Sequence, residues 1–282
     1  MRLFMSIDME GMPFIASGEH LYIKGALFSE ARRIATRITL WTAEAFHQRG
    51  FNEVVIADSH GPMVNLDVES LPEYVTLIRG FPRPLSMVTG VEKADAVVFL
   101  GYHSKAGTPK STFDHTYSSA IIDSLEINGT PASEFLLNTY TAGHFNKPVI
   151  MVAGDKALIE EDVARYTPWA TRVTLKESYS RFASSSPSLE KIRKELEKAV
   201  VEAVERLNKG EAKPLRARYP VEVKVRFLGT EMADVAELLP LIERIDGKTV
   251  KYVARDIVEA YRIFELLLAA APKLYPYSVI PT

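Results

Sequence analysis

Cysteine is absent from all 282 residues of the chain, which removes several kinds of chemistry at once. Without thiols the protein can form no disulfide bond, has no thiolate nucleophile and cannot build a cysteine-type zinc site. Any bound metal ion must therefore be held by histidine, aspartate or glutamate.

Strong net charge and long apolar stretches are lacking as well. The formal net charge is −2 and no long run of lysine and arginine occurs, so we expect neither a nucleic-acid partner nor an anionic membrane surface. The longest apolar stretch, residues 263–271, is interrupted by Glu265 and is too short to span a bilayer. The chain begins with the strand-like residues 2–5 and has no signal-peptide features, which predicts a cytoplasmic protein.

The composition is that of a globular protein, with 47% apolar and 25% charged residues. The length fits one large domain or two of ordinary size, and we favour two. The expected division is an α/β domain at residues 1–210, which carries the candidate site, and a small α+β domain at residues 211–282. Residues 105–147 are a candidate to pack with the second domain.

Short apolar runs separated by helical patterns predict a parallel sheet. These runs are residues 3–5, 54–57, 96–100 and 149–152. Runs that are apolar on both sides indicate a mostly parallel sheet with helices on both faces. Residues 221–227 instead alternate apolar and polar side chains, which predicts an antiparallel sheet in the smaller domain, with a closing helix at about residues 256–271.

A further helix is expected after the strand-like residues 119–127. We predict that it begins with Thr130 as N-cap and Pro131 in its first turn, so that Glu134 lies in that turn.

Two carboxylates follow the first predicted strand. In residues 6–11, Asp8 and Glu10 are one residue apart and would share a face, with their Cα atoms about 6.5 Å apart. Like charges at that distance raise each other's pKa, and no lysine or arginine within the motif neutralises them. A divalent metal ion would do so. The alternative is an ordinary polar turn that ends the strand at Gly11.

Histidines follow two other predicted strands, and working residues gather at the carboxyl ends of parallel strands. His60 and His103 offer imidazole nitrogens, and with Asp8, Glu10 and Glu134 they form a nitrogen and oxygen set suited to zinc or a similar metal. A carboxylate that bridges two metal ions can support hydrolysis. Each residue also has an ordinary explanation, since the histidines can be polar loop residues and Glu134 can complement a helix N-terminus.

His115 lies twelve residues beyond His103 on the same connection. If this connection folds back over the metal site, the His115 imidazole can transfer a proton or assist attack on a carbonyl group.

Several of these motifs, in their order, resemble the D-aminopeptidase (DppA) family. The similar stretches are residues 6–11, 58–60, 101–103, 114–115, 127–134 and 149–155. The resemblance covers most of the chain, and several matches in order are more specific than any single motif.

The resemblance implies a zinc-dependent aminopeptidase that removes an N-terminal D-amino acid from short peptides or aminoacyl amides. It also implies two Zn²⁺ ions per subunit, held by Asp8, Glu10, His60, His103 and Glu134 with Asp8 as the bridge, and His115 as the catalytic residue. Members of the family form a homodecamer of stacked rings around a channel.

Two other functions stay open at this point. One is a non-catalytic peptide-binding or transport-associated protein, because one fold hosts unrelated roles. The other is a dizinc amidase or aminopeptidase that acts on L-peptides, because the sequence does not reveal the chirality of the pocket.

Overall fold

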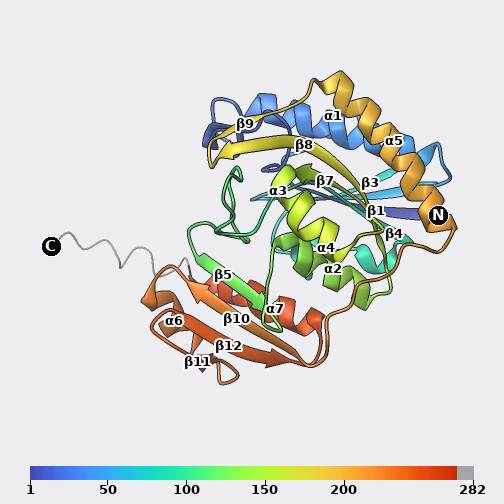
Figure 1. The fold of residues 1–282 in the computed structure, drawn as a ribbon. Helices are drawn as coiled ribbons and strands as arrows, with labels where there is room; N and C mark the ends of the chain where they lie inside the picture. Colours follow the sequence, from blue (N-terminus) through green and yellow to red (C-terminus); the bar gives the residue numbers. More distant parts are fainter. Residues whose placement is uncertain (272–282) are drawn as a thin grey trace.

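The computed structural model describes residues 1–271, which form two sheets and the helices that cover them (Figure 1). The order of strands in the larger sheet is β3-β2-β1-β4-β7-β8-β9, and all neighbours are parallel except the β8–β9 pair. Its strands are β1 (Arg2–Ile7), β2 (Glu53–Asp58), β3 (Val75–Ile78), β4 (Ala96–Tyr102), β7 (Val149–Asp155), β8 (Thr171–Ser180) and β9 (Ala183–Ser185).

Helices cover both faces of the larger sheet (Figure 1). On one face, α1 (Phe28–His47) and α5 (Leu189–Asn208) pack side by side and share an apolar core with the sheet. On the other face lies α2 (Glu134–His144). The shorter helical segments are η1 (Gly18–His20), η2 (Ser86–Val88), η3 (Val91–Lys93), α3 (Lys156–Leu158), the π-helical η4 (Ile159–Val163) and α4 (Ala164–Tyr166).

The smaller sheet is antiparallel, with the order β11-β12-β10-β5-β6. Its strands are β5 (Ile122–Ile127), β6 (Thr130–Pro131), β10 (Val221–Phe227), β11 (Glu243–Arg244) and β12 (Thr249–Ala254), and its helices are α6 (Thr230–Ala236) and α7 (Ile257–Ala270). The predicted fold class, a mostly parallel sheet with helices on both faces beside a smaller α+β unit, is therefore confirmed.

The helix predicted at Thr130 begins later than expected. Asn128 and Gly129 both have positive φ, 51° and 73°, and form a two-residue turn that pairs Ile127 with Thr130. An Asn-Gly turn of this kind favours a β-hairpin, so the chain continues as β6. The N-cap is Ser133, whose Oγ accepts a hydrogen bond from the backbone N–H of Leu136.

The carboxyl ends of three adjacent strands meet at one edge of the larger sheet. In the register, Ile7 of β1 lies beside Asp58 of β2 and Leu100 of β4, so the segments after these strands leave from the same place. Two glycines allow the β1 and β4 ends to approach closely. A Cβ atom on Gly11 would lie 1.9 Å from the Tyr102 carbonyl oxygen, and one on Gly101 would lie 2.0 Å from the Asp8 carbonyl oxygen.

Among residues 1–271, no helix combines the length and apolar character needed to cross a bilayer.

Candidate metal centre

Asp8 and Glu10 come directly after β1 and are almost completely buried, with exposed fractions of 2% and 6%. The Oδ1 atom of Asp8 accepts a hydrogen bond of 2.9 Å from the backbone N–H of Met9. Its Oδ2 atom is buried and has no hydrogen-bond partner among the described residues. A buried carboxylate oxygen without a partner carries a large desolvation penalty, so this atom marks a place where a cation is needed.

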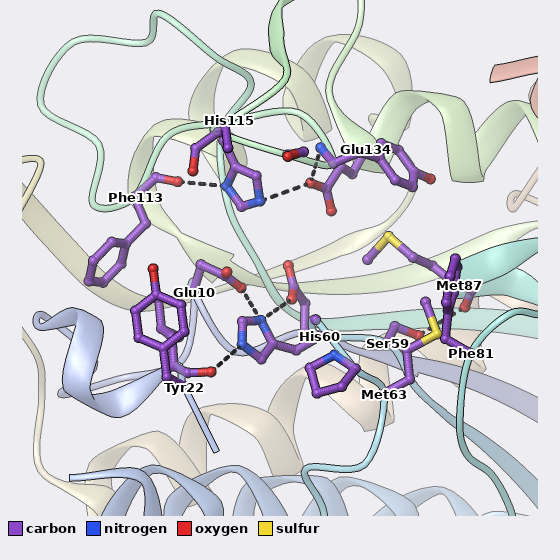
Figure 2. Close-up of a pocket in the computed structure, with 18 of the residues that line it drawn as sticks. Glu10, Tyr22, Ser59, His60, Met63, Phe81, Met87, Phe113, His115 and Glu134 are labelled. Atoms are coloured by element: carbon purple, nitrogen blue, oxygen red, sulfur yellow. Dashed lines mark hydrogen bonds and ion pairs between the residues drawn. The ribbon is translucent and has the colours of Figure 1, made fainter. Parts of the chain in front are cut away.

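His60 comes from the segment after β2 and faces the Glu10 carboxylate (Figure 2). Its Nδ1 lies 2.8 Å from Glu10 Oε2 and 3.5 Å from Asp8 Oδ1. Its Nε2 lies 3.0 Å from the carbonyl oxygen of Leu21. Because a carbonyl oxygen only accepts, Nε2 carries the hydrogen, and the lone pair of a neutral His60 points at the carboxylates.

His103 follows β4 and has the same arrangement. Its Nδ1 lies 2.9 Å from the Ser104 carbonyl oxygen, and its Nε2 lies 3.4 Å from both Asp8 Oδ2 and Glu134 Oε1. Nε2 is buried and has no hydrogen-bond partner among residues 1–271. A metal-binding histidine typically donates its other ring N–H to a carbonyl or carboxylate, as His60 and His103 do here.

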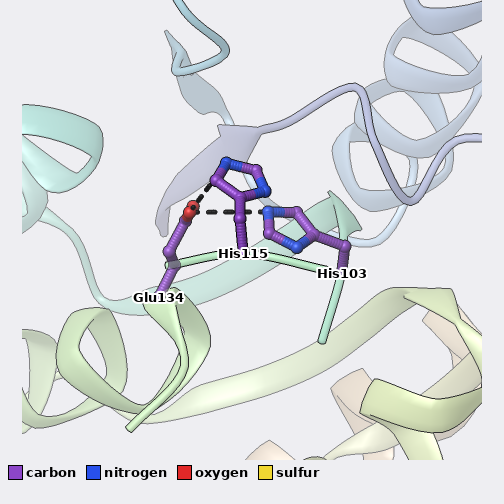
Figure 3. Close-up of side chains that lie close together, drawn as sticks. All are labelled: His103, His115 and Glu134. Carbon is purple, nitrogen blue, oxygen red and sulfur yellow. Dashed lines mark ion pairs between the residues drawn. The ribbon is translucent and has the colours of Figure 1, made fainter. Parts of the chain in front are cut away.

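Glu134 is the first residue of α2, and its Oε1 atom accepts a hydrogen bond of 2.7 Å from the backbone N–H of Tyr117. The same oxygen lies 3.5 Å from Nε2 of His115, whose Nδ1 is 2.8 Å from the carbonyl oxygen of Phe113. The His103 and His115 rings are stacked, with centroids 4.2 Å apart, and both turn toward Glu134 (Figure 3).

The distances from His103 Nε2 to the two carboxylate oxygens fit ligands of a shared metal ion better than they fit direct hydrogen bonds. Two ligands bonded to a tetrahedral zinc ion at about 2.0 to 2.1 Å are separated by about 3.3 to 3.4 Å. The distances from His103 Nε2 to Asp8 and Glu134 are both 3.4 Å. Two groups of side chains can present ligand atoms to a common ion, one formed by Asp8, Glu10 and His103 and the other by His103, His115 and Glu134.

The pKa values reflect the crowding of acids and imidazoles. Burial, together with the charge of Glu10, raises the pKa of Asp8 well above its usual range. Burial on its own would lower the pKa of His103, but the Glu134 and Asp8 carboxylates raise it to about 10. Burial and the neighbouring His103 lower the pKa of His115, so this imidazole is neutral at neutral pH. Burial would also lower the pKa of His60, but the Glu10 and Asp8 carboxylates raise it well above its usual range. When no cation is bound, protons on His60 and His103 therefore balance the carboxylates.

Lys176 is a buried cation that the sequence analysis missed. It lies in β8, and its Nζ donates hydrogen bonds to the carbonyl oxygens of Glu10 and, at 2.7 Å, of Ile15. Burial lowers the pKa of this lysine to about 8. These bonds hold the segment that carries Glu10, and they join residues more than 150 positions apart, which no local motif reveals.

The centre opens into one large cavity of about 1070 Å³. Asp8, Glu10, His60, His115 and Glu134 line it, whereas the buried His103 lies behind them. The structure thus brings all six candidate residues together. An open cavity beside a carboxylate and imidazole cluster is the arrangement that a metal-dependent hydrolase needs.

Three comparisons relate the chain to known proteins. A family model described as D-aminopeptidase matches residues 1–266. A D-aminopeptidase from Bacillus subtilis is 34% identical over 270 residues, which cover 93% of this chain and 94% of the relative. The solved structure of the Zn-dependent D-aminopeptidase DppA from Bacillus subtilis, described as a self-compartmentalizing protease, is similar with a TM-score of 0.91 and 32% identity. This similarity covers 97% of this chain and 98% of the other.

Proposed function

The chain belongs to the D-aminopeptidase family, and from this premise we propose that it is a zinc-dependent enzyme that releases the N-terminal D-amino acid of short peptides or aminoacyl amides. The observation that carries the proposal is the meeting of buried acids and imidazoles around Asp8 Oδ2 and His103 Nε2, which have no partner among the described residues.

Two Zn²⁺ ions per subunit are part of the proposal. Asp8, Glu10, His60, His103 and Glu134 would hold them, with Asp8 between the two. Asp8 suits a shared position because its two oxygens face different histidines, His60 at 3.5 Å and His103 at 3.4 Å. Bound zinc would polarise the scissile carbonyl group and lower the pKa of the attacking water.

His115 is the proposed catalytic residue. Its Nδ1–H is fixed by the Phe113 carbonyl oxygen, and its ring lines the cavity. A lowered pKa keeps Nε2 free to take a proton from the attacking water and to pass it to the leaving amine as the C–N bond breaks. His115 is also within reach of a metal ion, so measuring zinc in the H115A variant separates the two roles.

We further propose a homo-oligomer, with the decamer as the expected form, and a division of the chain into residues 1–210 and 211–282. The relative of similar structure is described as self-compartmentalizing, which supports an assembly of copies. The two strands at residues 122–131 would belong with the second domain, because they pair within its sheet. Light scattering of the purified protein measures the number of subunits.

The test of function is an assay of the zinc-loaded protein on matched D-Ala and L-Ala amides. We expect the D-amide to be cleaved at least tenfold faster. Faster cleavage of the L-amide would identify an aminopeptidase or amidase for L-substrates. Stoichiometric zinc without turnover of any peptide or amide would identify a peptide-binding protein and overturn the proposal.

A further inference from the structure

The cavity extends to two sides of the metal centre, and the two sides differ in chemistry (Figure 2). Tyr22 and Phe113 lie on one side of Glu10 and His60, and Met63, Phe81 and Met87 lie on the other. We call the first side the η1 arm, formed by Tyr22, Lys24, Phe113 and Arg181. We call the second side the α7 arm, formed by Met63, Phe81, Met87, Leu268 and Ala269.

Contacts outside the centre support this grouping. In the η1 arm, Arg181 is tied to the Phe113 segment because its carbonyl oxygen accepts from the Phe113 N–H at 3.1 Å. In the α7 arm, the Glu265 carboxylate hydrogen-bonds with Ser86, the neighbour of Met87. Leu268 and Ala269 lie one turn further along the same face of α7 and line the same cavity.

Most side chains of the α7 arm are apolar. Met63 and Met87 are buried, with exposed fractions of 4% and 3%, and Phe81 presents an apolar ring that is 57% exposed. Glu265 is the one ionisable side chain that α7 adds to the cavity lining. Methionine side chains adapt readily to apolar groups of different shape, which makes this arm suited to a bulky side chain.

The η1 arm carries positive charge instead. Lys24 is exposed and makes no ion pair within residues 1–271. The guanidinium group of Arg181 forms an ion pair with the Asp114 carboxylate. Lys24 and Arg181 line the cavity on this side, so they suit the carboxylate at the end of a short peptide.

We propose that the α7 arm binds the side chain of the substrate's N-terminal residue and that the peptide's carboxyl end lies toward Lys24 and Arg181. The enzyme then favours short peptides whose N-terminal residue is large and apolar, such as leucine or phenylalanine, over those that begin with alanine. This assignment rests on the proposed aminopeptidase function.

The size of the expected preference follows from the apolar area that the side chain buries. Each additional methylene group that the substrate buries is expected to raise kcat/KM about fourfold. The leucine side chain has three more carbon atoms than that of alanine, so we expect kcat/KM for D-Leu amide to exceed that for D-Ala amide by at least about tenfold.

The experiment compares kcat/KM for the amides of D-Ala, D-Leu and D-Phe in the wild type and in A269W. Ala269 is exposed on α7 and lines the cavity, so tryptophan there fills the arm without entering the core. We expect A269W to reduce the D-Phe to D-Ala ratio of kcat/KM by at least about tenfold. The matched control is L266W, because Leu266 lies on the same helix, is 52% exposed and does not line the cavity. This control should keep the wild-type ratio.

The orientation of the peptide is tested with K24E. The variant should lower kcat/KM for the dipeptide D-Leu-Gly about threefold to tenfold relative to D-Leu amide, which has no carboxylate. An equal effect on both substrates would contradict the orientation.

The failure of this inference can be told apart from the failure of the proposed function. Turnover with D-Ala amide as the best substrate, or a D-Phe to D-Ala ratio that A269W leaves unchanged, overturns the α7 arm as the subsite and leaves the aminopeptidase intact. No turnover of any amide by the zinc-loaded protein overturns both.

Discussion

Two buried polar clusters lie next to each other in this protein, and they differ in how their polar atoms are satisfied. One is the candidate metal centre. The other, which we call the tyrosine network, consists of Ser6, Tyr102, Asn138, Tyr117 and Tyr261. Both begin on β1 or directly after it, since Ser6 belongs to the tyrosine network and Asp8, two residues later, belongs to the metal centre.

The tyrosine network is complete within the protein. Ser6 Oγ lies 2.7 Å from the Tyr102 hydroxyl, which accepts a 3.1 Å hydrogen bond from Asn138 Nδ2. Asn138 Oδ1 accepts 2.9 Å and 3.1 Å hydrogen bonds from the hydroxyls of Tyr261 and Tyr117. A buried network of this kind has a structural role because each member finds its partner in the fold.

In the candidate metal centre, two polar atoms have no such partner within residues 1–271. Asp8 Oδ2 and His103 Nε2 are buried but have no hydrogen-bond partner among the described residues. The difference teaches that burial and polarity alone do not identify a functional site. What distinguishes this cluster is that a carboxylate oxygen and an imidazole nitrogen, both without a partner in the described part of the chain, lie 3.4 Å apart, where a cation can balance their desolvation.

The largest expected effect comes from removing the metal. Dialysis against a strong chelator should abolish hydrolysis of D-aminoacyl amides, and added Zn²⁺ should restore it. Far-UV circular dichroism should stay native after chelation, because protonated His60 and His103 balance the acids and the tyrosine network is unaffected. Full activity after complete removal of zinc would show that the acids and imidazoles have a structural role only.

The H115A variant separates chemistry from metal binding. We expect kcat to fall by about 10² to 10⁴, the usual range for loss of a general base, while zinc content stays at the wild-type value. The matched control is H144A, since His144 contacts Tyr219 at the surface and does not line the cavity. Loss of zinc in H115A would instead assign His115 as a ligand.

The N138A variant tests the other side of the comparison. Removing this buried amide takes away its hydrogen bonds with the hydroxyls of Tyr102, Tyr117 and Tyr261, at about 1 kcal/mol for each lost bond. Urea unfolding should therefore show a free energy of unfolding lower by about 3 kcal/mol, with zinc content unchanged. A variant of full stability that has lost zinc would reverse the roles of the two clusters.

The smallest expected effect is the change in pH-dependent stability that Glu265 causes. This residue lines the cavity and is partly buried. Burial raises its pKa from 4.5 to about 7, although Ser86, Arg83 and Arg262 act in the opposite direction. Because the folded pKa is the higher one, the native state binds more protons, and stability falls as the pH rises from about 4.5 to about 7. The E265Q variant should lack this part of the pH dependence, on the order of 1 kcal/mol after allowance for exposure. Equal pH dependence of Tm in both proteins would contradict the assignment.

The sequence predicted which side chains meet at the candidate metal centre better than it predicted their surroundings. Asp8, His60 and His103 follow apolar strand runs, and parallel strands end at a common edge, so a local pattern and one topological rule bring them together. The predicted start of α2 at Thr130 was wrong. The Asn128–Gly129 turn forms a hairpin with β6, so the helix begins at Glu134 instead.

Lys176 and the tyrosine network were not predicted, for a physical reason. Their partners are set by contacts between distant segments, such as Lys176 with Glu10 and Tyr261 with Asn138. Periodicity and motif spacing report only on neighbours along the chain. They indicate which residues reach the edge of a sheet and not which buried polar atoms are satisfied there.

Anomalous diffraction at the zinc absorption edge from crystals of the zinc-loaded protein tests the central claim most directly. We predict two peaks per subunit, one on each side of Asp8, with His103 Nε2 and Asp8 Oδ2 both bonded to zinc at about 2.0 to 2.2 Å. Density that places no metal ion within bonding distance of these two atoms would contradict the account.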